Sequence, residues 1–317
     1  MVNVLYNVVD RMYIGHIPDI GALALTGVGV CMPIIMLITA FAALVSMGSA
    51  PRASVLMGRS DNEEAHYTLG NSFIMLIIIA LVLTVFFRRF AEPILMAFGA
   101  SENTIGYAMD YMRIYTLGTI FVQFALGLNA FITAQGFAKI SMATVVIGAV
   151  INIVLDPIFI FGFHMGVKGA ALATILSQAV SAIWVLRFLT GKKTMLKLQK
   201  KYFRLRGSVV GPCLLLGMSP FIMQATESAI SVCFNSSLYR YGGDIAVGAM
   251  SILTSIMQFS MLPLQGFTQG AQPITGYNFG AGNADRVRQT FRLLLRYCLT
   301  YSCLLYTSPS PRDKRQS

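Results

Sequence analysis

Three acidic residues stand out because they lie inside long apolar stretches of this chain. They are Asp10, Asp156 and Glu227. An ionisable side chain in the core of a bilayer costs roughly 2.5–3.5 kcal/mol on insertion scales, so it usually faces a cavity and handles an ion, a proton or a charged cargo. We therefore expect these carboxylates to have a function beyond folding.

Asp156 has the most informative surroundings of the three. Asn152 precedes it by four residues, on the same face of a helix, and Pro157 follows it directly. Proline cannot donate a backbone hydrogen bond, so Pro157 is predicted to act as a helix hinge. A carboxylate, an amide and a hinge at one depth predict a coordination site. The alternative is that Asp156 bonds backbone groups freed by the proline.

Asp10 and Asp156 together could bind Na⁺ or a proton. Na⁺ is a hard cation that prefers oxygen ligands, and carboxylate, amide and hydroxyl groups supply them. Two carboxylates that lie close together share a proton rather than titrating independently. The alternative for Asp10, which adjoins Arg11, is an ion pair with that residue.

Glu227 lies in the middle of another apolar stretch, with Gln224 among its polar neighbours. A carboxylate in a central cavity attracts lipophilic cations, which aromatic faces also favour. We expect Glu227 and Gln224 to handle a substrate or a proton. The alternative is a hydrogen bond between neighbouring helices.

The composition predicts the elements that position these residues. Hydrophobic residues make up 56% of the chain and charged residues 12%, which is about half the charged share of a soluble domain. A spanning helix needs about 20 mostly apolar residues. Nine stretches meet or approach this length, over residues 1–14, 22–47, 69–87, 105–134, 140–163, 170–189, 209–238, 245–267 and 291–306. The chain is therefore predicted to be an all-α polytopic membrane protein.

Both ends of the chain depart from this pattern. The first stretch is shorter than a full span, so we expect Met1 to lie inside a helix whose beginning is missing. Residues 307–317 are polar and proline-rich, unlike everything before them. We interpret them as a non-native tail and leave them out of the fold prediction.

Basic residues predict how the helices are oriented. Most Lys and Arg residues fall in loops and flanks on one side, above all in the linker over residues 191–207. The positive-inside rule places this linker and the N-terminus in the cytoplasm. Topology therefore explains the net charge of +11 better than a nucleic-acid partner does.

An internal repeat predicts two related halves. Gly48, Pro51 and Gly58 recur as Gly270, Pro273 and Gly280, at a constant offset of 222 residues. Asp61 maps onto Asn283 at the same offset. An even number of predicted helices separates the copies, so the halves are parallel, as in some transporters. We assign residues 1–190 to the first half and residues 208–306 to the second, and expect three more helices to follow.

Three segments suggest a family. The segments Tyr6–His16, Asn152–Pro157 and Gly266–Gly282 resemble multidrug and toxic compound extrusion (MATE) transporters of the bacterial multidrug-pump branch. The resemblance runs from Met1 to about Tyr301. It implies twelve helices in two parallel six-helix bundles, with about nine present here. It also implies export of lipophilic organic cations or drugs by alternating access, coupled to H⁺ or Na⁺, across the bacterial cytoplasmic (inner) membrane.

The resemblance also implies roles for individual residues. In similar transporters an aspartate, an asparagine, a second aspartate and a threonine form a cation site in the first bundle. By position these are Asp10, Asn152, Asp156 and Thr174. Glu227 matches a glutamate that part of the family uses. No cofactor beyond the coupling ion is implied, and we expect a monomer in the lipid bilayer.

Two rival functions remain open. The first is a flippase for lipid-linked oligosaccharide or cell-wall precursors, which would favour a basic cavity, whereas the intramembrane charges here are acidic. The second is a membrane enzyme or receptor, but no nucleophile–base constellation and no phosphate-binding Gly-Lys-Ser/Thr loop is evident. We therefore predict that the protein is not an enzyme, and that this chain does not transport as written.

Overall fold

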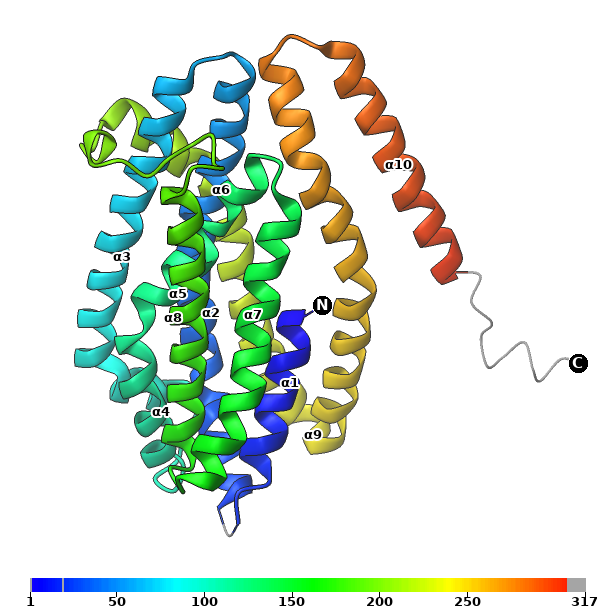
Figure 1. Cartoon of the computed structure of the whole chain (residues 1–317). Coiled ribbons are helices and arrows are strands. Elements are labelled where there is room, and N and C mark those ends of the chain that lie inside the picture. The colour runs from blue at the N-terminus through cyan, green and yellow to red at the C-terminus, as the bar shows by residue number, and fades with distance from the viewer. Residues whose placement is uncertain (1, 19, 307–317) are drawn as a thin grey trace, which may run out of the picture.

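The computed structural model describes residues 2–18 and 20–306, for residues 2–8 and most of residues 228–259 by the backbone alone. Within these ranges every regular element is a helix. The elements are α1 (Val2–Gly15), α2 (Gly21–Gly58), α3 (Asn62–Ala97), α4 (Ile105–Leu117), α5 (Thr119–Gly127), α6 (Asn129–Ala134), α7 (Ala138–Pro157), the π-helix η1 (Ile158–Gly162), α8 (Val167–Thr190), the 3₁₀-helix η2 (Lys200–Tyr202), α9 (Gly207–Gly280) and α10 (Ala284–Tyr306). Figure 1 shows the long helices side by side in an elongated bundle, with α10 at one edge.

The helices confirm an all-α polytopic membrane protein. Five described helical segments are long and apolar enough to span a bilayer, namely Gly21–Gly58, Asn62–Ala97, Ala138–Gly162, Val167–Thr190 and Gly207–Glu227. A bent pair of helices adds a sixth. A helix satisfies its own backbone hydrogen bonds, which is why it is the element that crosses lipid. The predicted tail, residues 307–317, lies outside the described residues.

The sixth span departs from the single helix predicted over residues 105–134. Helix α4 ends at Leu117, and the continuation through α5 and α6 is bent away from it by 58°. Gly118 lies at the bend, where an added Cβ would come within 2.5 Å of the Ile175 side chain on α8. Close packing of α8 at this point, which local sequence does not reveal, accompanies the break.

Helix α9 contains two of the predicted spans in one helical run. Its 74 residues would extend for roughly 110 Å if they were straight. Yet Gly217 lies against Leu44 and Gly280 lies against Val55, two positions only eleven residues apart on α2. The run must therefore turn back on itself, as Figure 1 shows. Both arms of α9 pack against α2.

The predicted repeat is visible in the backbone at the ends of α2 and α9. Ser60 and Gly282 have positive φ values of 61° and 73°. Their N–H groups donate to the carbonyl three residues earlier, and those of Asp61 and Asn283 donate to the carbonyl five residues earlier, at 2.9–3.2 Å in all four cases. This is the Schellman arrangement that closes helix C-termini. The two copies are 222 residues apart, the same offset as the sequence repeat.

The two repeat copies also face each other. A Cβ added to Gly58 would collide with the Tyr277 carbonyl oxygen, and one added to Gly280 would collide with that of Val55. Both pairs follow the same offset of 222 residues, so the contacts are reciprocal. The ends of α2 and α9 therefore cross, backbone on backbone, around a local two-fold axis.

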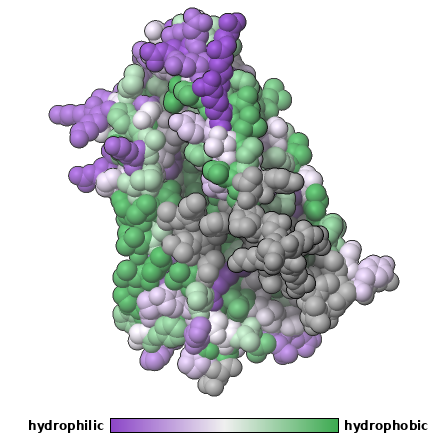
Figure 2. All heavy atoms as spheres, turned by 90° about the vertical axis from the view of Figure 1, so that its right-hand side faces the viewer, coloured by the Kyte–Doolittle hydropathy of each residue, from purple (hydrophilic) through white to green (hydrophobic). Residues whose placement is uncertain are grey.

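The basic linker is held against the first half. Gln135 Oε1 accepts three hydrogen bonds of 2.7–2.9 Å, from the Thr194 hydroxyl and from the two backbone N–H groups that follow it. Asn71 Oδ1 accepts the Arg206 backbone N–H at 2.8 Å. Figure 2 shows hydrophilic side chains gathered at this end of the molecule, above a hydrophobic band.

Candidate functional site

Helices of the first half bring Asp10 and Asp156 together. Asp10 lies on α1 and Asp156 near the end of α7, and these two helices pack against each other and against α8. The two aspartates are 6% and 0% exposed. Two carboxylates are thus buried in a protein interior where an uncompensated charge is costly.

Asn152 completes the α7 part of the cluster. Its side-chain Nδ2 donates to Asp156 Oδ1 at 3.2 Å, and Asn152 is 1% exposed. The spacing of four residues puts both side chains on one face of α7, as the sequence predicts. The amide therefore holds one carboxylate oxygen in a fixed position.

The Asp10 carboxyl lies within hydrogen-bonding reach of the Asp156 carboxyl. Asp10 Oδ1, Asn152 Oδ1 and Asp156 Oδ2 are buried and have no hydrogen-bond partner among the described residues. Arg11 is exposed, and no salt bridge between Arg11 and Asp10 forms in the described part of the chain. Asp10 thus pairs across the helices rather than with its neighbour.

Thr174 lies near the cluster beside Tyr111, a residue that the sequence analysis did not identify. The Thr174 hydroxyl donates to the Ala170 carbonyl at 3.0 Å on α8, and the Thr174 side chain lies next to the Tyr111 hydroxyl. Tyr111, on α4, is 3% exposed and lies near Asp10. A polar tip on a buried tyrosine usually needs a partner, and this is the signal that could have identified Tyr111.

The chemistry of this cluster suits a small cation. Carboxylate, amide, hydroxyl and phenol groups neighbour one another in this cluster, and three of the oxygens are buried without a partner among the described residues. Two carboxyl groups in contact cannot both stay charged unless a proton or a cation lies with them. The arrangement can therefore bind either one H⁺ or a cation such as Na⁺.

The break in α7 lies directly beside the cluster. Helix α7 ends at Pro157, and a single π-helical turn, η1, follows. Such π-helical segments are rare and occur frequently at functional sites. Gly169, at the start of α8, packs against this turn so closely that an added Cβ would lie 2.7 Å from Phe159. The role of Pro157 as a hinge stays a prediction.

Glu227 lies apart from the carboxylate cluster. It is on the first arm of α9 and is exposed in the described structure. Gln224, one turn before it, lines a cavity of about 360 Å³. The predicted roles of Glu227 and Gln224 in handling a cargo or a proton stay predictions.

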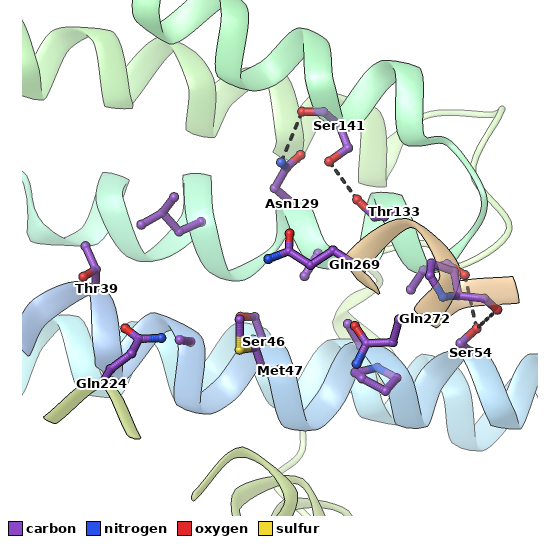
Figure 3. Close-up of a pocket in the computed structure, with 17 residues that line it drawn as sticks. Thr39, Ser46, Met47, Ser54, Asn129, Thr133, Ser141, Gln224, Gln269 and Gln272 are labelled. Carbon is purple, nitrogen blue, oxygen red and sulfur yellow. Dashed lines mark hydrogen bonds between the residues drawn. The ribbon is translucent and has the colours of Figure 1, made fainter. Parts of the chain in front are cut away.

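This cavity, shown in Figure 3, lies between the two halves. Residues of α2, α5, α6 and α7 form one side, and both arms of α9 form the other. Four side-chain amides line it: Asn129, Gln224, Gln269 and Gln272. None of the described lining residues carries a formal charge. We call it the amide cavity.

Hydroxyl groups fix the walls of the amide cavity. Thr133 donates to Ser141 Oγ at 2.8 Å, and Asn129 Nδ2 donates to the Ser141 carbonyl at 3.2 Å. Ser54 Oγ donates to the Pro273 carbonyl at 3.0 Å, a bond that joins α2 to α9. Figure 3 shows these bonds at the edges of the cavity, with Gln269 and Gln272 between them. No local pattern in the sequence indicated this site, because its residues are distant along the chain.

Comparison with known proteins identifies the family of this chain. The family model described as MatE matches residues 1–158 and 220–307, which is most of the chain. It covers α1 to α7, most of α9 and α10.

Individual relatives agree with this match. The chain is 29% identical, over 298 residues, to the multidrug export protein MepA of Staphylococcus haemolyticus (strain JCSC1435), covering 93% of this chain and 64% of that protein. It is also similar to a solved structure, that of the MATE multidrug transporter DinF-BH in complex with a drug. The two structures superpose with a TM-score of 0.87 at 36% identity, over 95% of this chain and 67% of that chain. A crystal structure of MATE in the bent conformation superposes with a TM-score of 0.89 at 24% identity, covering 96% and 68% of the two chains, and so shows the fold alone. The chain spans 64% of the length of the MepA relative.

Proposed function

The chain belongs to the MATE family of transporters, and from that premise we propose that it exports lipophilic organic cations in exchange for H⁺ or Na⁺. Export would proceed by alternating access of the two halves to the two sides of the membrane. The observation that carries the proposal is the buried pair Asp10 and Asp156, in a cluster with three acceptor oxygens that lack a donor among the described residues.

The coupling step would take place at this pair. A proton or a Na⁺ ion supplies the positive charge that two buried carboxylates in contact require. When the ion leaves, the charge of the cluster changes by one unit beside the α7 break at Pro157. A local charge change next to an irregular helix is a physical means by which ion binding can bias one arrangement of helices over another. Thr174 and Tyr111 would hold the third wall of the ion site.

The cargo is inferred from charge and from relatives. Asp10, Asp156 and Glu227 are acidic, which favours a cationic cargo. Two relatives support a drug-like cargo: one is called a multidrug export protein, and the other is a multidrug transporter solved in complex with a drug. Glu227 and Gln224, one turn apart on α9, would meet the cargo.

The basic linker sets the proposed orientation. Its end of the bundle would face the cytoplasm of a bacterium, with the N-terminus on the same side of the inner membrane. The alternative function, transport of a lipid-linked precursor with an anionic headgroup, would need basic side chains in the central cavity. Among the described lining residues of the amide cavity there is no Lys or Arg to pair with such a headgroup, and the intramembrane residues Asp10, Asp156 and Glu227 are acidic, so cation export is the better supported of the two.

The test is efflux of ethidium from cells that express the gene taken whole from its source genome. Wild type and Asp156→Asn are compared while the Na⁺ and H⁺ gradients are collapsed separately. Asp110→Asn is a matched control, because Asp110 is a partly exposed aspartate of the same half that pairs with Lys168 at 3.4 Å. We expect Asp156→Asn to abolish efflux and Asp110→Asn to preserve it. Equal efflux from Asp156→Asn and wild type would overturn the coupling site, and no efflux under any gradient would favour the precursor flippase.

A further inference from the structure

The amide cavity differs in chemistry from every acidic site described above. Its polar lining consists of amides and hydroxyls, and Glu227, the nearest carboxylate along the chain to Gln224, is not part of the described lining. Gln269 and Gln272 come from the second arm of α9, while Asn129 comes from α6. Both halves of the molecule thus contribute hydrogen-bonding groups to one space.

An uncharged lining of this kind disfavours the binding of an ion that has lost its hydration shell. A cation that enters loses hydration and meets no counter-charge, whereas an uncharged polar group exchanges water for amide partners. Each glutamine offers both a donor NH₂ and an acceptor carbonyl, so a row of them can match amide, hydroxyl or carbonyl groups. The volume of about 360 Å³ falls in the range of pockets that hold small molecules.

We propose that the amide cavity is a binding subsite for the uncharged, hydrogen-bonding part of the cargo, recognised by Gln269 and Gln272 on α9 and by Asn129 on α6. The proposal rests on the proposed export function and narrows its cargo to molecules that carry amide, hydroxyl or carbonyl groups besides any positive charge. The positive charge of the cargo is then recognised elsewhere, by Glu227.

The position of the subsite gives a bound molecule a second effect. Ser54 already joins α2 to α9 through its bond to the Pro273 carbonyl, at the edge of the cavity. A molecule bonded to α6 on one side and to α9 on the other adds further links between the halves. Binding in this subsite therefore favours the arrangement in which the two halves are closed at this end.

The test is equilibrium binding of two probes to the whole protein, purified in lipid nanodiscs with no ion gradient. Chloramphenicol is uncharged and carries an amide and hydroxyl groups; tetraphenylphosphonium is a lipophilic cation with no hydrogen-bonding group. Gln269→Leu and Gln272→Leu remove one amide each. Gln265→Leu is the matched control, because Gln265 is an exposed glutamine on the same arm of α9 outside the cavity lining.

We expect each cavity variant to weaken chloramphenicol binding by about 3- to 10-fold, the usual worth of a neutral hydrogen bond, and to leave tetraphenylphosphonium within about twofold. Gln265→Leu should change neither. Gln269→Glu keeps the size and polarity of the side chain and adds a charge, so it should strengthen tetraphenylphosphonium binding even if a leucine variant fails to fold.

Three results would overturn the subsite. They are absence of chloramphenicol binding to wild type, equal loss of both probes in the leucine variants, and no change in either probe. Binding in the nanodiscs needs no gradient, so weaker chloramphenicol binding to Gln269→Leu and Gln272→Leu would support the subsite even if efflux responded to neither gradient. Failure of ion coupling in the efflux assay is therefore distinguishable from failure of the subsite.

Discussion

The carboxylate cluster and the amide cavity are both polar sites inside a membrane-spanning bundle, but they are built differently. The cluster lies within one half, and its two carboxylates are almost fully buried. One oxygen of each carboxylate and the Asn152 side-chain oxygen lack a donor in the described part of the chain. The cavity lies between the halves, has no charged residue in its described lining and is framed by hydrogen bonds such as that of Ser54 to Pro273. One site concentrates acidic side chains; the other has no charged side chain in its described lining.

This difference has a physical consequence for motion. Separating an ion pair in a low-dielectric interior is expensive, because Coulomb energies there are many times larger than in water. Neutral hydrogen bonds contribute only about 0.5–1.5 kcal/mol each, so an interface built from them can open and close at modest cost. In the proposed alternating access, the amide cavity would open at modest cost because its described lining carries amides and hydroxyls, whereas Arg52 lies outside it in a neighbouring pocket between α2 and α9.

The largest expected effect comes from removing charge from the cluster. Asp10→Asn leaves Asp156 without its partner and halves the negative charge available to hold a cation. Ethidium efflux driven by an imposed ion gradient should fall to the level of empty proteoliposomes. Asp110→Asn, the partly exposed control, should keep the efflux of wild type. Equal efflux from Asp10→Asn and wild type would show that Asp10 does not hold the coupling ion.

A smaller effect is expected from the crossing of α2 and α9, which bounds the cavity. Gly280→Ala places a Cβ onto the Val55 carbonyl, so the helices must move apart. We expect a loss of about 1–3 kcal/mol in the free energy of unfolding, as for other overpacked contacts.

Gly266→Ala is the matched control for this crossing, since an added Cβ there meets nothing within 4 Å on the same helix. That substitution should stabilise the protein by up to about 1 kcal/mol through helix propensity. Unfolding in SDS, followed by circular dichroism, measures both variants. If the two variants shifted unfolding in the same direction, the close backbone crossing would be in doubt.

A third prediction concerns the hydroxyl groups around the cluster. Tyr111→Phe and Thr174→Val each remove one hydroxyl of two that are neighbours beside the cluster. Each should weaken the apparent affinity for the coupling ion by roughly 3- to 10-fold, and the double variant should be little worse than either single one. The ion dependence of efflux in proteoliposomes measures this. Additive losses would mean that the two hydroxyls act independently and not as one wall of the site.

The sequence predicted the carboxylate site far better than the cavity, for a physical reason. A charge in an apolar stretch is conspicuous, and Asn152 and Asp156 are neighbours on one helix, so hydropathy and spacing identify them. Placing Asp10 and Thr174 beside them required a family resemblance, because contacts between α1, α7 and α8 are not local. Tyr111 was missed because a tyrosine in an apolar helix is unremarkable until its hydroxyl finds a partner.

The cavity and the bend at Gly118 depend on packing that no local pattern records. Gln224 and Gln269 line one cavity only because α9 turns back on itself and both arms pack on α2. The bend at Gly118 goes with the close approach of Ile175 from another helix. The repeat, in contrast, was visible in sequence because its glycines and helix caps are fixed by backbone geometry, which leaves a constant residue signature.

The smallest expected effect comes from Ser54, the hydroxyl that joins the halves at the edge of the cavity. Ser54→Ala removes the bond to the Pro273 carbonyl, and Ser54 is fully buried, so water does not replace it in the closed arrangement. The lost bond to Pro273, worth about 0.5–1 kcal/mol, acts where the halves meet. The longer bond of Ser54 to the Ala134 carbonyl, at 3.5 Å, lies within the first half. We expect the closed population at this end to fall, seen as a two- to fivefold increase in labelling of a cysteine introduced at Thr133. Thr39→Val is the control, because the Thr39 hydroxyl also lines the cavity but donates to Met36 of its own helix at 2.9 Å. Equal labelling of the two variants would mean that the Ser54 bond does not help to hold the halves together. The comparison of the carboxylate cluster with the amide cavity would then depend on the amide side chains alone.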